Sequence, residues 1–74
     1  MERSTLGRIL WRAAADEEFR GRALDNLGIT LAQEGFLLND GEMTQLRTWW
    51  DELQTLSPRR AAERIQALAR AYRY

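Results

Sequence analysis

The chain has 74 residues, with eleven arginines and eleven acidic residues, so its formal net charge at neutral pH is zero. Of its residues, 45% are hydrophobic and 9% aromatic, which is typical of a folded chain and excludes an intrinsically disordered one. It contains no cysteine, histidine or lysine, which excludes disulfides, thiol and Schiff-base chemistry, a P-loop lysine and the usual zinc and haem ligands.

The first predicted helix begins with Ser4 or Thr5 as its N-cap. Its apolar residues recur at spacings of three and four and therefore share one face. This face consists of Leu6, Ile9, Leu10, Ala13 and Ala14. Trp11 lies about 100° from the centre of the face, beside Gly7. We expect Trp11 either to form a contact patch or to lie under the apolar linker at residues 36–38.

Two short helices follow. Asp16 is the predicted N-cap of the second, and its first turn carries Glu17 and Glu18, where the helix dipole favours negative charge. Asn26 is the predicted N-cap of the third, which ends at Gly35 because glycine most easily takes the left-handed conformation.

The longest amphipathic segment begins at Asn39, which forms a predicted capping box with Glu42. Its apolar stripe is Met43, Leu46, Trp49, Trp50, Leu53 and Leu56. Ser57 and Pro58 end this helix and start the last one as its N-cap and first residue, and the last helix runs to about residue 72. Its apolar face is Ala61, Ala62, Ile65, Leu68, Ala69 and Tyr72.

The whole pattern predicts an all-α fold. No segment alternates with a period of two, and there is no repeat or flexible linker, so residues 1–74 should form a single compact bundle of four to five short helices. Charges interrupt every apolar run before it reaches the length of a membrane span. With no cysteine and no secretory signal, we expect a soluble, cytoplasmic protein that does not enter a membrane.

The sequence offers little for catalysis. The acidic residues that can be placed lie at helix starts or on solvated faces, and the glycines do not have the spacing of a phosphate loop. Metal-binding helical bundles use Glu-x-x-His, and this chain has no histidine. We therefore predict no catalytic, cofactor or metal site, and no enzymatic activity.

Charge is unevenly distributed along the chain. Residues 1–57 hold six arginines and ten acidic residues, a net charge of −4, whereas residues 58–74 hold five arginines and one acidic residue, a net charge of +4. A basic helix with Tyr72 and Tyr74 as stacking groups could contact nucleic acid. The isoelectric point of about 6.2 argues against it, and the body supplies acids that these arginines can face.

Aromatic residues indicate a protein partner instead. Three tryptophans in so short a chain are many, and tryptophan and arginine dominate the hot spots of protein interfaces. Trp49 and Trp50 point about 100° apart, so one lies at the edge of its stripe, unless both are core residues with Arg47 covering that edge. Homo-oligomerisation through this helix also stays open. The predicted partner contacts are Trp11, Trp49, Trp50, Arg60, Arg64 and Tyr72.

Residues 16–43 resemble a known pattern. The matching residues are Asp16, Phe19, Arg20, Leu24, Leu31, Gly35, Leu38 and Glu42. This spacing resembles that of the small helical peptides of the nitrile-hydratase-leader-peptide clan and of the small alpha subunit of extradiol ring-cleavage dioxygenases. Three positions depart from the pattern, because Asn26 replaces Asp, Leu27 replaces Pro, and Asn39 replaces Ser or Thr.

The two branches of this resemblance imply different functions. A dioxygenase small subunit packs on a larger catalytic chain and helps to close its active site. A leader peptide is held by modifying enzymes and precedes a core that carries Cys, Ser or Thr, yet none of these residues follows Ser57. The sequence therefore favours a non-catalytic, protein-binding accessory subunit, with a leader-type precursor as the alternative.

Overall fold

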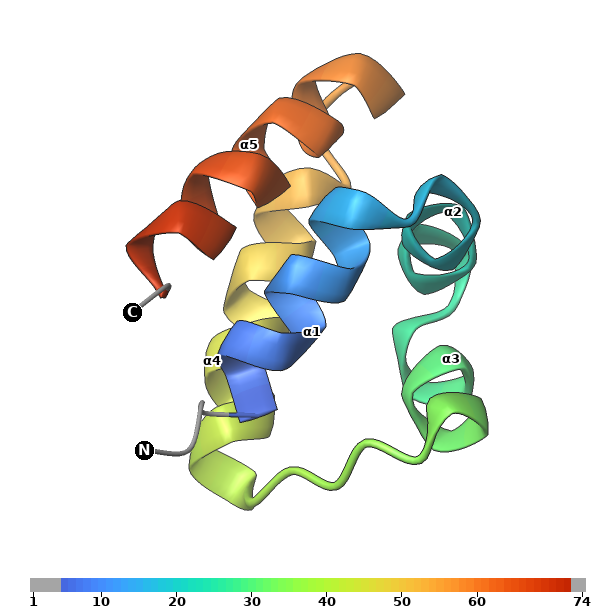
Figure 1. Ribbon diagram of the computed structural model, residues 1–74, viewed down its shortest axis with the longest axis vertical. Helices are drawn as coiled ribbons and strands as arrows, with labels where there is room; N and C mark the ends of the chain where they lie inside the picture. The colour runs from blue at the N-terminus through green and yellow to red at the C-terminus, as the bar shows by residue number, and fades with distance from the viewer. Residues whose placement is uncertain (1–4, 73–74) are drawn as a thin grey trace.

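The computed structural model describes residues 5–72, and within them it contains five helices and no strand. The helices are α1 (Thr5–Ala15), α2 (Glu17–Asp25), α3 (Leu27–Glu34), α4 (Asp40–Leu53) and α5 (Pro58–Ala71) (Figure 1). The radius of gyration, 11.3 Å, is that of a compact chain of this length. The predicted all-α bundle is confirmed.

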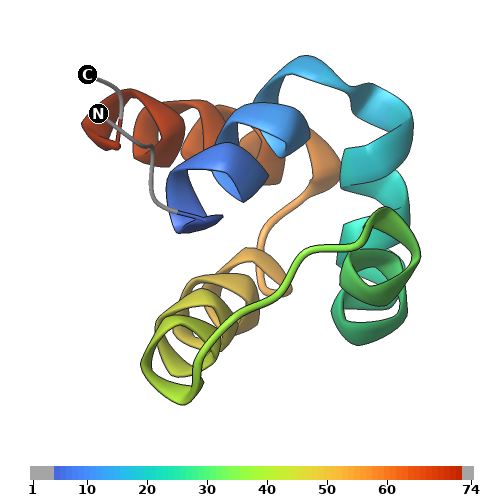
Figure 2. The same ribbon diagram turned by 60° about the horizontal axis from the view of Figure 1, so that its bottom comes forward.

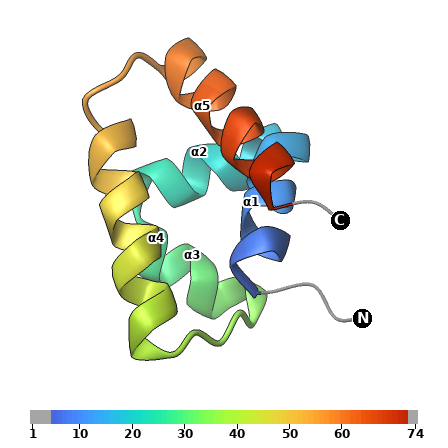
Figure 3. The ribbon, with the colours of Figure 1, turned by 90° about the vertical axis from the view of Figure 1, so that its left-hand side faces the viewer.

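The helices surround one core. α1 lies beside α5, and α2 and α3 form a neighbouring pair on one flank (Figures 1 and 2). α4 stands across the core from the α1–α5 pair, as Figure 3 shows. An extended segment between α3 and α4 closes the lower side of the bundle (Figure 2).

Local sequence signals determine where most helices begin and end. The predicted N-caps Asp16, Asn26 and Ser57 each accept a hydrogen bond from a backbone N–H in the first turn. Asn39 and Glu42 form the predicted capping box, with hydrogen bonds of 2.8 and 3.0 Å. These bonds satisfy donors that a helix start otherwise leaves unpaired.

The sequence also predicts where α3 and α4 end. Gly35 ends α3 in the left-handed conformation, with φ of 77°, as expected. The expectation that α4 continues through Leu56 is wrong, because the helix ends at Leu53 and i→i+3 hydrogen bonds tighten the chain into turns at Thr55 and Leu56. Ser4, one of the two candidate caps of α1, lies outside the described residues.

Asp16 joins α1 to α2 through two hydrogen bonds. Its carboxylate accepts from the backbone N–H of Phe19 at 3.0 Å and from Nε of Arg12 at 3.1 Å. The bond from Phe19, followed by that from Arg12, lowers the pKa of the Asp16 carboxyl below its usual value. The ionised form of Asp16 therefore stabilises the folded chain.

This linkage predicts a pH dependence for Asp16→Asn, which keeps a capping side chain but removes the charge. The contribution of the carboxylate is present above the unfolded pKa of about 3.9 and is lost as the pH falls through the lower folded pKa. We expect the difference in Tm between wild type and variant to be largest near neutral pH and to shrink below about pH 4. Thermal unfolding followed by circular dichroism measures it, and a pH-independent difference contradicts the expectation.

Two side chains at the C-terminal end of α4, one turn apart, donate hydrogen bonds to α2. Trp50 donates its indole N–H to the carbonyl oxygen of Ala23 at 2.9 Å, and Gln54 donates its amide N–H to that of Leu24 at 2.8 Å. Both carbonyls belong to the last turn of α2, where the helix supplies no partner of its own. α4 therefore caps the C-terminus of α2.

Candidate protein-binding surface

α1 and α5 pack against each other, and both helices bury small residues. Gly7 and Ala13 of α1 and Ala61 and Ala69 of α5 are all buried. Ala69 also lines the surface between the two helices, together with Ala14 and Ala15 of α1. Longer residues at the edges of the contact then form the walls of a groove.

This groove, which we call the Trp11 groove, has a volume of about 210 Å³ and runs between α1 and α5. It is lined by Trp11, Ala14, Ala15, Gln66, Ala69 and Arg70. Half of the lining is alanine, and none of these six residues is acidic. The groove therefore combines a small apolar floor with hydrogen-bond donors at its edges.

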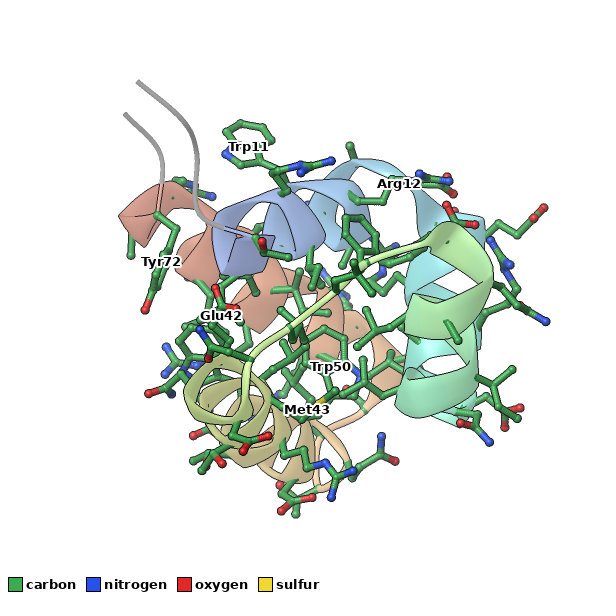
Figure 4. The ribbon with its side chains drawn as sticks, turned by 90° about the horizontal axis from the view of Figure 1, so that it is seen from below. Trp11, Arg12, Glu42, Met43, Trp50 and Tyr72 are labelled. Carbon is green, nitrogen blue, oxygen red and sulfur yellow. The ribbon has the colours of Figure 1, made fainter. Side chains whose placement is uncertain are left out.

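Trp11 contributes an unusual donor to this groove. Its indole nitrogen is buried and has no hydrogen-bond partner in the described part of the chain. Buried indole N–H groups usually find an acceptor, because an unsatisfied buried donor costs about 1–3 kcal/mol. Figure 4 shows Trp11 on the outer side of α1, away from the interior that contains Trp50.

The alternative position of Trp11, under the linker, is wrong. The linker residue Phe36 instead lies beside Arg8, whose guanidinium carbon is 5.8 Å from the centre of the Phe36 ring. Trp11 instead lines the groove with α5. Arg8 and Trp11 are three residues apart, so their side chains leave α1 only about 60° apart, Arg8 beside Phe36 and Trp11 beside α5.

The arginines of α5 divide into two groups. Arg64 contacts Glu52 of α4 with an N–O distance of 3.0 Å, and Arg59 contacts Glu63 at 3.9 Å. Arg60 and Arg70 form no ion pair and no side-chain hydrogen bond with another residue in the range 5–72. One acid of the body, Glu52, thus faces the basic helix, whereas Glu63 belongs to that helix itself. Arg70 lines the Trp11 groove without an ion pair in residues 5–72.

The other predicted contact residues do not join this groove. Trp49 and Tyr72 are half-buried and meet edge to face, with ring centres 5.3 Å apart, where α4 approaches the end of α5. Trp50 is a core residue with 4% of its surface exposed, so its predicted place on a contact surface is not what the structure shows. Arg60 and Arg64 are exposed but do not line the groove. Of the six residues, only Trp11 lines the groove, while Trp49 and Tyr72 meet each other elsewhere.

Sequence reasoning missed a second depression, between α4 and the junction of α2 with α3. It has a volume of about 360 Å³, and its lining includes Met43, Trp50, Asp25, Arg47 and Asp51. Residues from three helices form it, so no local pattern could have indicated it. Its lining carries both signs of charge and therefore favours no particular ligand.

Within residues 5–72, no helix is both long and apolar enough to cross a membrane. No three acidic side chains among these residues come together in a way that could hold a metal ion.

The fold and the groove define a small all-α bundle with a helix–helix groove on its surface. Comparisons of the chain with protein-family models, with curated proteins and with solved structures find no match.

Proposed function

We propose that this protein is a non-catalytic protein-binding module that acts as a small accessory subunit of a larger enzyme or assembly. The observation that carries the proposal is the Trp11 groove, whose lining combines alanines with a tryptophan and an arginine. Within residues 5–72 the buried indole nitrogen of Trp11 has no hydrogen-bond partner and Arg70 has no ion pair. Tryptophan and arginine around a small apolar floor are the composition of an interface hot spot. A groove between two helices is also a common receptor for a partner helix.

The resemblance of residues 16–43 supports the same proposal at the level of fold. Asp16 and Asn39 are helix N-caps, Gly35 is a C-cap, and Phe19 is fully buried. Each of these residues thus has a structural role in a helical bundle. The dioxygenase small subunits that the segment resembles use such a bundle to pack on a larger chain, whereas no contact within this structure specifically favours a leader peptide.

The test is to isolate the tagged protein gently from its own cells and to record its native mass spectrum, with two matched variants. Ala15→Arg places a long cation in the groove, and Ala67→Arg makes the same change at an exposed position of α5 outside it. We expect wild type and Ala67→Arg to retain a larger chain in fixed stoichiometry and Ala15→Arg to lose it.

Other results would overturn the proposal. An unmodified monomer with nothing bound, or equal retention by all three forms, removes the accessory-subunit function of the groove. An altered covalent mass of the chain points to the leader-type alternative. Retention that disappears steeply with added salt and depends on nucleic acid points to nucleic-acid binding.

A further inference from the structure

We infer that the Trp11 groove binds an acidic amphipathic helix of its protein partner, with a carboxylate on Arg70 and an apolar side chain on the alanine floor. This inference rests on the proposed function and specifies the chemistry of the partner. It follows from the charge, the shape and the unsatisfied donor of the groove, which are independent observations.

The charge of the groove selects the partner. Arg70 carries a full positive charge and has no acidic partner in residues 5–72, although Arg59 and Arg64 of the same helix both have one. The groove lining contains no carboxylate that could repel an acidic ligand or attract a basic one. An arginine at an interface prefers a carboxylate, which its planar guanidinium can bind through two hydrogen bonds.

The shape of the groove selects a helix. Ala14, Ala15 and Ala69 have short side chains, which leave room for the backbone of a partner to come near. The indole of Trp11 forms one wall and provides a flat apolar surface for a side chain such as Leu or Phe. A helix that carries apolar and acidic residues three or four positions apart presents both to the groove together.

The indole N–H of Trp11 adds the second polar contact. Its nitrogen is covered in the free protein, so an acceptor reaches it only when a neighbouring side chain moves. Gln66 and Arg70 line the same groove, are exposed, and can change rotamer. Arg70 can therefore turn toward a carboxylate of the ligand, and the same movement can expose the indole N–H to that ligand.

The experiment uses the purified protein and a displayed library of helix-forming peptides with random residues on one face. We expect the selected peptides to carry Asp or Glu beside a large apolar residue. Arg70→Gln should weaken their binding about tenfold or more, as expected for a lost charge-assisted hydrogen bond. Arg59→Gln is the matched control, because Arg59 is an exposed arginine of the same helix that does not line the groove, and it should leave the affinity unchanged.

Trp11→Phe separates binding from a merely structural role. The variant removes an unsatisfied buried donor, so the free energy of unfolding should stay the same or rise, while the affinity for the selected peptides should fall several-fold. The inference is overturned by basic or uncharged selected peptides, by the absence of any selected binder, or by equal effects of Arg70→Gln and Arg59→Gln. It is also overturned if sedimentation shows that a second copy of the chain occupies the groove. If Ala15→Arg still abolishes capture of the cellular partner, the proposed function stands without it.

Discussion

Trp50→Ala is expected to lower the free energy of unfolding by about 3–5 kcal/mol, the range for removing a large aromatic side chain from a core. Trp50 is 4% exposed and contributes both buried area and the hydrogen bond to the carbonyl of Ala23. A bundle of this size has a total stability of about 3–5 kcal/mol. We therefore expect the variant to be largely unfolded at room temperature, as measured by far-ultraviolet circular dichroism and urea titration.

Trp50→Phe tests the hydrogen bond apart from most of the buried area. The ring remains, but the carbonyl of Ala23 loses its donor, which should cost about 1–3 kcal/mol. Trp49→Ala is the matched control at the neighbouring position, where the ring is half-buried and the expected loss is smaller than for Trp50→Ala. Equal losses for Trp49→Ala and Trp50→Ala would contradict the assignment of Trp50 to the core.

Phe19→Ala is expected to have a similar effect, about 3–5 kcal/mol, because Phe19 is fully buried where α1, α2 and the linker meet. Its ring centre lies 6.2 Å from that of Phe36 in an edge-to-face arrangement, and the guanidinium carbon of Arg12 is 5.1 Å from it. Such ring contacts contribute beyond the buried area, by about 0.5–1.5 kcal/mol for an aromatic pair. Urea unfolding followed by tryptophan fluorescence measures the loss.

A double-mutant cycle isolates the ring contact from the cavity. Phe19→Leu nearly conserves volume, so it should cost much less than Phe19→Ala, about 1.5 kcal/mol or below. Combined with Phe36→Leu, it should give a coupling energy of about 0.5–1.5 kcal/mol. A coupling energy of zero would show that the two rings lie near each other without stabilising the fold through their contact. A small loss of stability for Phe19→Ala would contradict the place of Phe19 in the core.

The helix boundaries could be predicted because they depend on neighbouring residues. Asp16 and Asn39 carry side-chain acceptors that reach donors three residues further along the chain, and Gly35 takes a conformation that other residues avoid. The end of α4 was predicted three residues late, because the apolar period continues to Leu56 although the chain has already turned. The apolar period identifies one face of a helix. A residue in the turns that follow the helix can lie on the same side of the bundle as that face and so extend the apparent period.

The roles of the three tryptophans could not be predicted, because each depends on a helix distant in sequence. The same apolar stripe contains Trp49 and Trp50, and only the position of α2 makes Trp50 a core residue that donates to Ala23. Trp11 faces a groove because α5, which begins at Pro58, packs beside α1. No spacing within one helix encodes either contact.

The sequence by itself therefore determined the all-α class, the caps and the apolar faces, since these follow from interactions within a few residues of the chain. Only the tertiary structure decided which faces meet, and with them the capping of α2 by Trp50 and Gln54 and the groove beside Trp11. The physical reason is that helix packing depends on the sizes of side chains brought together from separate elements, and here alanines of α1 and α5 form half of the lining of the groove.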